Sequence, residues 1–237
     1  RLGRIMTVRW VLAFGASLVI SAAILIYFHD RFWWPPDDGA YAYVAERILA
    51  GDVLNRDVQD IHMGYVNFAN ALAFNLFGLQ LVSLRFPLAA AGLIQACIIF
   101  LLFRPRGLIL AMTATITLTA LSFVQFLNPT AHWYSLFLVI LIIACLTGLP
   151  RGNGWRLFIV GLLLITLLMF RQLSGIIVGI GVMAFLLYEA PGGAPGLNTI
   201  LARGLNAIMF IGLAGYMTAK ADLPAILLFG VGPLLIL

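Results

Sequence analysis

The sequence predicts an all-α protein, a polytopic bundle of transmembrane helices. Hydrophobic residues make up 63% of the 237 residues and charged residues only 10%, whereas a soluble domain has roughly 45–50% and about 25%. The arginines occur singly between apolar runs, and arginines in such loops determine the orientation of membrane helices. We therefore expect one transmembrane domain over residues 1–237, with about eight spans in a lipid bilayer, and no role in binding nucleic acid.

The first span is predicted over residues 10–28. At about 1.5 Å per residue this run covers about 28 Å, close to one hydrocarbon thickness. Arg1, Arg4 and Arg9 precede it, and a basic flank is typical of the cytoplasmic side. A signal peptide is the alternative, but its apolar core would be shorter and followed by a small-residue cleavage site. We expect a retained helix and a cytoplasmic N-terminus.

Residues 29–85 are predicted to form an extracytoplasmic loop with juxtamembrane helices. Pro35-Pro36 prevent continuation of the first helix. From Gly39 to Ala50 the apolar residues recur with a helical period, and this segment is too short to span the membrane. Residues 65–82 are apolar enough to span, yet they carry three asparagines on a broad arc of one face. We expect them to lie half-buried at the outer surface.

The remaining spans are predicted over residues 86–237. If residues 65–82 do not cross the membrane, Phe86 to Phe103 is the second span. Arg104 and Arg106, which follow it, then lie on the cytoplasmic side, as the positive-inside rule requires. The later spans then alternate in direction. They are predicted at 107–127, 133–149, 157–175, 176–188 and 205–219, with a last one from residue 224.

The acidic residues gather in the first outer loop. Seven of the nine acids lie between residues 30 and 60, namely Asp30, Asp37, Asp38, Glu46, Asp52, Asp57 and Asp60. A chain this apolar has little use for carboxylates as solubilisers, so the cluster suggests a site. The Asp37-Asp38 pair could accept a proton from an incoming hydroxyl or bind a divalent cation. Alternatively, Asp38 caps the helix that follows.

A second group of polar residues follows the surface helix. Asp57 and Asp60 can approach Asp37 if the chain folds back, and the alternative is a solvated loop in which Arg56 is a local salt-bridge partner. His62 stands alone, without a second His or Cys at ligand spacing, which argues against zinc.

Arg171 is the other informative residue. Fourteen apolar residues, 157–170, separate it from the inner boundary. That distance is about 21 Å, short of the roughly 30 Å hydrocarbon core. Arg171 therefore lies below the outer surface, where it either snorkels or faces a polar cavity that holds an anion.

Several short motifs occur in a familiar order. They are Asp37-Asp38-Gly39-Ala40-Tyr41 with Ala45, Gly51 and Asp57, then Phe77-Gly78, Arg85-Phe86-Pro87, and Arg171-Gln172 with Gly175. In this order and spacing, over residues 30–190, the chain resembles the GT-C superfamily of polytopic glycosyltransferases. That superfamily includes protein O-mannosyltransferases and lipid A aminoarabinose transferases. The resemblance implies an integral, multi-pass protein of the bacterial inner membrane.

The resemblance also implies a reaction. A polyprenyl-phosphate-linked sugar would be the donor, and transfer would occur on the extracytoplasmic side by direct displacement. Asp37 would be the general base. Asp57, with Asp38 or Asp60, would position the acceptor or, together with Asp37, hold a divalent cation. Arg171, with His62 or Arg56, would neutralise the leaving phosphate.

The chain departs from the family pattern in two ways. His62-Met63-Gly64 stands where the family has Lys-Pro-Pro, and the chain is short for the family. These departures favour a truncated or divergent member. They also keep a second function open, a non-catalytic GT-C-like structural subunit that binds other membrane subunits. A transporter ranks below both, because the spans carry almost no charge and show no repeat.

Overall fold

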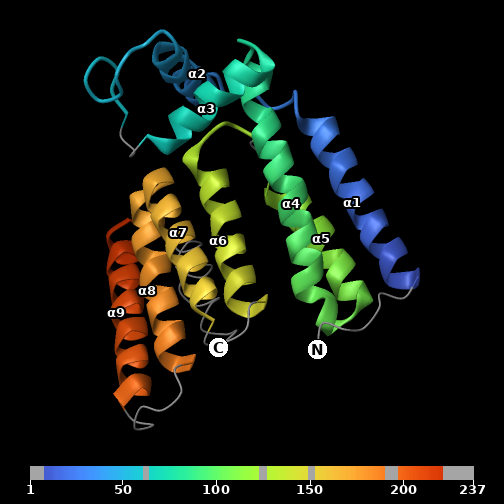
Figure 1. Ribbon diagram of the computed structural model, residues 1–237, viewed down its shortest axis with the longest axis vertical. Helices are drawn as coiled ribbons and strands as arrows, with labels where there is room; N and C mark the ends of the chain where they lie inside the picture. The colour runs from blue at the N-terminus through green and yellow to red at the C-terminus, as the bar shows by residue number, and fades with distance from the viewer. Residues whose placement is uncertain (1–7, 61–63, 123–126, 149–152, 190–196, 221–237) are drawn as a thin grey trace. The chain divides into compact units, whose positions relative to one another are not determined.

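The computed structural model describes residues 8–60, 64–122, 127–148, 153–189 and 197–220, which are helical and contain no strand (Figure 1). The α-helices are α1 (Val8–Phe28), α2 (Pro35–Leu49), α3 (Tyr65–Phe77), α4 (Phe86–Phe103), α5 (Leu108–Ser122), α6 (Ala131–Gly148), α7 (Gly154–Phe170), α8 (Gln172–Glu189) and α9 (Leu197–Lys220). Two 3₁₀-helices, η1 (Leu81–Arg85) and η2 (Arg104–Arg106), flank α4.

Four segments are long and apolar enough to cross a bilayer. They are α1, the continuous run Leu81–Arg106 around α4, α6 and α8. The protein is therefore an all-helical integral membrane protein, as predicted. The helices α5 and α7 are apolar as well but shorter. The count of about eight spans stays a prediction, and the span predicted from residue 224 lies outside the described residues.

Some helix boundaries match the predicted spans and others do not. The span predicted at 157–175 is interrupted, because α7 ends at Phe170 and α8 begins at Gln172, and α9 begins at Leu197 instead of residue 205. The helix α4 has the predicted bounds, and α1 begins at Val8 instead of Trp10. The helix α2 begins at Pro35, four residues before the predicted start at Gly39. The reason is that Pro35 and Pro36 occupy the first two helical positions, where the fixed φ suits a helix and the missing N–H removes no bond. The prolines therefore start α2 as well as separating it from α1.

The chain divides into two compact units, Arg1–Ser174 and Gly175–Leu237. In the first unit, α1, α4 and α5 pack on one another, and α6 packs on α4 and α7. The helices α2 and α3 pack together at the end of this unit where α1 ends and α4 begins (Figure 1). The second unit contains most of α8 and all of α9.

Small polar side chains line the contact between α1 and α5. The Thr119 hydroxyl donates to the Ser21 hydroxyl at 3.2 Å, and both residues are buried. Ser17 and Thr115 instead donate to backbone carbonyls one turn earlier in their own helices. Short hydroxyl side chains let two membrane helices approach closely while their polar atoms stay bonded.

Candidate functional site

A buried ion pair fixes the start of α2. Asp38 lies in the first turn of α2, where its Oδ2 accepts a hydrogen bond from the Trp34 N–H at 2.7 Å. The same oxygen lies 3.6 Å from Nη2 of Arg85, and the two side chains are 2% and 0% exposed. Burial raises the pKa of the Asp38 carboxyl, although the Trp34 hydrogen bond and the Arg85 charge act in the opposite direction. Asp38 therefore does not precede the helix as its cap, which was the alternative to catalysis. It lies inside α2, whose N-cap residue is Trp34, and accepts from the N–H of that residue.

Arg85 holds the link between α1 and α2 against the start of α4. Its Nη1 donates to the carbonyls of His29 and Arg31 at 3.0 and 2.6 Å, and its Nη2 donates to the Phe32 carbonyl at 3.5 Å. The guanidinium also lies over the Trp33 ring, 3.4 Å from the ring centroid. Sequence reasoning noted Arg85 only as part of a family motif. A lone arginine between two apolar segments would have been the signal, since a buried guanidinium must find acceptors.

Asp37 contacts a different segment of the chain from Asp38. Its side chain is exposed, and its Oδ2 accepts from Nδ2 of Asn128 at 3.5 Å. Asn128 is 8% exposed, and its Oδ1 accepts from the indole N–H of Trp133 at 3.1 Å. Because Trp133 occupies the amide oxygen, the NH₂ group of Asn128 is the part that faces Asp37. This contact ties α2 to the segment before α6.

Tyr41 lies one turn after Asp37 in α2, and the charges around it affect the pKa of its hydroxyl. Burial raises the pKa of Tyr41 to about 12; the negative charges of Asp60 and Asp37 act in the same direction, and the positive charge of Arg171 opposes them. Three charged groups from different parts of the chain therefore act on one hydroxyl. At neutral pH this hydroxyl is protonated and can donate a hydrogen bond.

Asp60 is held by contacts with α3 and with the loop that follows α2. Its carboxylate accepts from Nδ2 of Asn67, and its backbone N–H donates to Oδ1 of Asn55 at 3.1 Å. Asn70, one turn after Asn67, donates from Nδ2 to the carbonyl of Pro129 at 3.0 Å. Asn67 and Asn70 are 1% and 0% exposed. Two asparagines of the predicted polar arc are thus buried and hold α3 against Asp60 and the segment before α6.

Arg171 lies immediately after α7, at the same site. Its backbone is extended, its N–H donates to the Leu167 carbonyl at 2.8 Å, and its side chain is half-buried. The ring of the preceding Phe170 stacks on Tyr134 and meets Tyr65 edge-on, with centroids 4.9 and 5.9 Å apart. These rings hold the end of α7 against α3 and α6, and the positive charge of Arg171 acts on Tyr41 of α2.

Asp57 and Arg56 form a separate, solvated pair. Arg56 donates from Nε and Nη2 to the Asp57 carboxylate at 3.0 and 2.7 Å, and the Val53 N–H donates to the same carboxylate at 2.9 Å. The hydrogen bond from Arg56 lowers the pKa of Asp57, and the Val53 hydrogen bond adds to it. These contacts match the local salt bridge that was the alternative reading. The charges of Asp60 and Asp37, and not that of Asp57, contribute to the raised pKa of Tyr41.

Metal binding gains no support from the described residues. Among them, no group of three or more His, Cys, Asp or Glu side chains could hold a metal ion. The proposed metal pair of Asp37 and Asp57 stays a prediction, because the contacts of Asp57 are with Val53 and Arg56. His62 lies outside the described residues.

The arrangement can bind and deprotonate a polar group beside an anion. Asp37 is the exposed carboxylate, Tyr41 the neutral donor and Arg171 the cation, and Asp60 completes the set. Comparison of the chain with protein-family models, with curated proteins and with solved structures finds no match.

Proposed function

We propose that the protein is a membrane glycosyltransferase of the GT-C type. It transfers a sugar from a polyprenyl-phosphate donor to an acceptor hydroxyl on the extracytoplasmic side. The observation that carries the proposal is a set of contacts around α3. Its Asn67 binds Asp60, its Asn70 binds the segment whose Asn128 contacts Asp37, and its Tyr65 packs on the residue before Arg171. A displacement at a sugar phosphate needs a base and a cation at one site.

Asp37 is the general base of this reaction. The acceptor oxygen attacks the anomeric carbon and forms the new glycosidic bond while its proton moves to the Asp37 carboxylate. Asp37 suits this task better than Asp38, because Asp38 is buried against Arg85 and Asp37 is exposed. The uncharged amide of Asn128 orients the Asp37 carboxylate.

Arg171 stabilises the leaving group. The bond between the anomeric carbon and the phosphate oxygen breaks, and the oxygen keeps the electron pair as polyprenyl phosphate. A guanidinium pairs with phosphate through two parallel hydrogen bonds, and a released phosphate beside lipid would otherwise be poorly solvated. Tyr41 is the neutral donor of the site, and Asp60 positions the acceptor.

The placement of the site in the membrane belongs to the same proposal. The helices α2 and α3 lie along the outer surface, the N-terminus is cytoplasmic, and about eight spans cross the bacterial inner membrane. Two features support it: α2 and α3 have 15 and 13 residues, too few to span, and all acids of the first unit lie between residues 30 and 60.

The test is sugar transfer by the purified protein in proteoliposomes. Labelled polyprenyl-phosphate mannose and polyprenyl-phosphate aminoarabinose serve as donors. Asp37→Asn keeps the shape of the side chain and removes the base, so the rate should fall by a factor of about 10²–10⁴. Asp57→Asn is the matched control, because Asp57 is an exposed acid of the same loop that pairs with Arg56. Its rate should stay within about twofold of the wild type.

Two results would contradict the proposal. A wild-type rate with Asp37→Asn would remove Asp37 from the reaction. Absence of transfer by the wild type with both donors, while purification captures a stable complex with other membrane subunits, would favour the non-catalytic structural subunit instead.

A further inference from the structure

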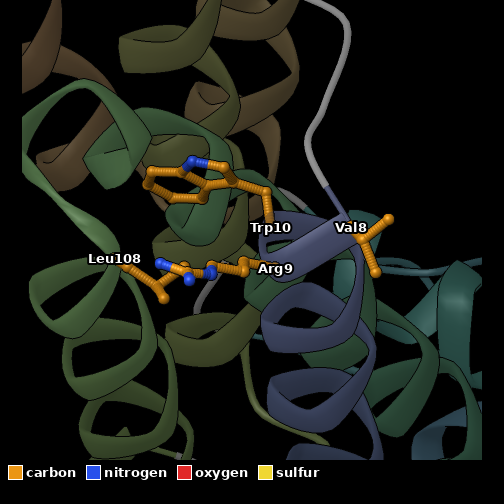
Figure 2. A pocket seen from close by; sticks show the side chains of 4 residues that line it. All are labelled: Val8, Arg9, Trp10 and Leu108. Atoms are coloured by element: carbon orange, nitrogen blue, oxygen red, sulfur yellow. The ribbon is translucent and has the colours of Figure 1, made fainter.

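A second polar feature of the first unit lies at the opposite end of α1. Val8, Arg9 and Trp10 of α1 and Leu108 of α5 line an open hollow of about 610 Å³, a size within the roughly 300–1,000 Å³ of ligand pockets. Figure 2 shows the Arg9 side chain extending from α1 toward Leu108, with the Trp10 indole in the same hollow. The site described above uses none of these residues.

The hollow is basic. Arg9 is exposed and lines it, the Arg104 guanidinium lies 5.8 Å from the centre of the Trp10 ring, and Arg106 is exposed in the same short helix η2. Every acidic residue of the first unit lies between Asp30 and Asp60. Since α1 has 21 residues, its two ends are about 32 Å apart. This end of α1 therefore carries arginines, and every carboxylate of the same unit belongs to the segment beyond the other end of α1, a separation of charge that favours binding of an anion here.

The walls of the hollow are apolar. Trp10 packs edge-on against Phe100, and Leu108 belongs to the partly buried rim of the cluster formed by Ala13, Phe100 and Ala111. Val8, Leu12 and Val19 are 74%, 67% and 69% exposed and form a stripe along α1 that begins at the hollow. A soluble anion would use the arginines alone, whereas a lipid also uses the indole and this stripe.

From these observations we propose that the hollow binds the headgroup of an anionic phospholipid. The lipid phosphate pairs with Arg9, and Arg104 and Arg106 add to the positive field. Trp10 lies at headgroup level, where indole rings are enriched, and an acyl chain follows the stripe from Val8 to Val19. Basic pockets between membrane helices bind acidic headgroups by this combination of charge and apolar contact. The site is independent of sugar transfer.

The test is lipid binding to the purified wild-type protein in neutral detergent, measured by native mass spectrometry. Phosphatidylglycerol, phosphatidylcholine and inorganic phosphate are the three probes. Phosphatidylglycerol should bind about tenfold more tightly than phosphatidylcholine, because only the former leaves the phosphate charge unbalanced. Arg9→Gln should remove this preference, and since Arg9 is exposed the variant should fold as the wild type does.

Arg47→Gln is the matched control. It removes the same charge from an exposed arginine of α2, at the far end of the unit, and should keep the lipid preference. The proposal is overturned if Arg9→Gln binds phosphatidylglycerol as the wild type does, or if the two lipids bind equally. It is also overturned if inorganic phosphate displaces phosphatidylglycerol at an equal concentration, because the hollow would then be a site for free phosphate.

Discussion

The buried pair of Asp38 and Arg85 gives the sharpest prediction about stability. At the observed 3.6 Å, two unit charges attract by about 4–5 kcal/mol at an effective dielectric constant of about 20. Removing one partner of such a pair costs about 3–5 kcal/mol, because the other charge is left buried alone. Asp38→Asn keeps an acceptor for the Trp34 N–H, so its cost should lie in this range.

Arg85→Met should lower the free energy of unfolding more than Asp38→Asn does. Besides losing Asp38, it leaves the carbonyls of His29, Arg31 and Phe32 without their donor. These hydrogen bonds are only partly buried, so each one lost adds about 0.5–1.5 kcal/mol. The double variant should be less destabilised than the sum of the two single variants by about 3 kcal/mol, since the second substitution removes a charge that already lacks its partner.

The assay is unfolding of the four proteins by SDS in mixed micelles, followed by far-ultraviolet circular dichroism. The exposed pair of Arg56 and Asp57 gives the control cycle, in which no coupling should be resolved because solvent screens the charges. If the costs of Asp38→Asn and Arg85→Met add within about 0.5 kcal/mol, the two charges do not stabilise each other and the reasoning is refuted.

Two further predictions concern residues that shape the candidate site. Burial raises the pKa of Tyr41 to about 12, so between pH 10 and 12 the folded protein keeps a proton that the unfolded chain releases, and stability falls as the pH rises. Tyr41→Phe should reduce this loss in SDS unfolding at pH 9 and 11, whereas Tyr43→Phe, at an exposed position of α2, should leave it as in the wild type. Identical curves for Tyr41→Phe and the wild type would contradict this prediction. Gly64 precedes α3 with φ of 100°, and a Cβ there would collide with the Leu54 side chain, so Gly64→Ala should lower the unfolding free energy by about 1–3 kcal/mol. Gly161→Ala, inside α7 with open space around it, should be neutral or stabilising by up to about 1 kcal/mol; an equal loss in both variants would mean that backbone strain at Gly64 is not the cause.

The long apolar helices could be predicted from sequence because hydrophobic length alone determines them. The bounds of α4 and the end of α1 at Phe28 match the apolar runs, whose ends are marked by polar or proline residues. The start of α2 could not be read in this way, because Pro35 and Pro36 are compatible both with a break and with the first turn of a new helix.

The partners of the polar residues depended on contacts that are distant in sequence. Arg85 binds carbonyls more than fifty residues earlier in the chain, and nothing in the local sequence identifies them. Which of Asp57 and Asp60 acts on Tyr41 together with Asp37 depends on the conformation of the loop, in which Asn55 is left-handed with φ of 62°. The Asp57 carboxylate bonds to Val53 and Arg56, whereas Asp60 bonds to Asn67 of α3. Arg171 was expected inside a span over 157–175, but α7 ends at Phe170 and Arg171 has an extended backbone before α8. The length of an apolar run does not show such a break, and the depth of Arg171 in the membrane stays a prediction.

The most direct measurement is inhibition of sugar transfer by free polyprenyl phosphate, the released product. If Arg171 binds the phosphate beside Asp37 and Asp60, Arg171→Gln should weaken this inhibition by about tenfold or more, the loss expected for one charge-assisted hydrogen bond. Arg47→Gln, a change of the same charge at an exposed position of α2, should leave the inhibition constant unchanged. An unchanged inhibition constant in Arg171→Gln would show that the donor phosphate binds elsewhere.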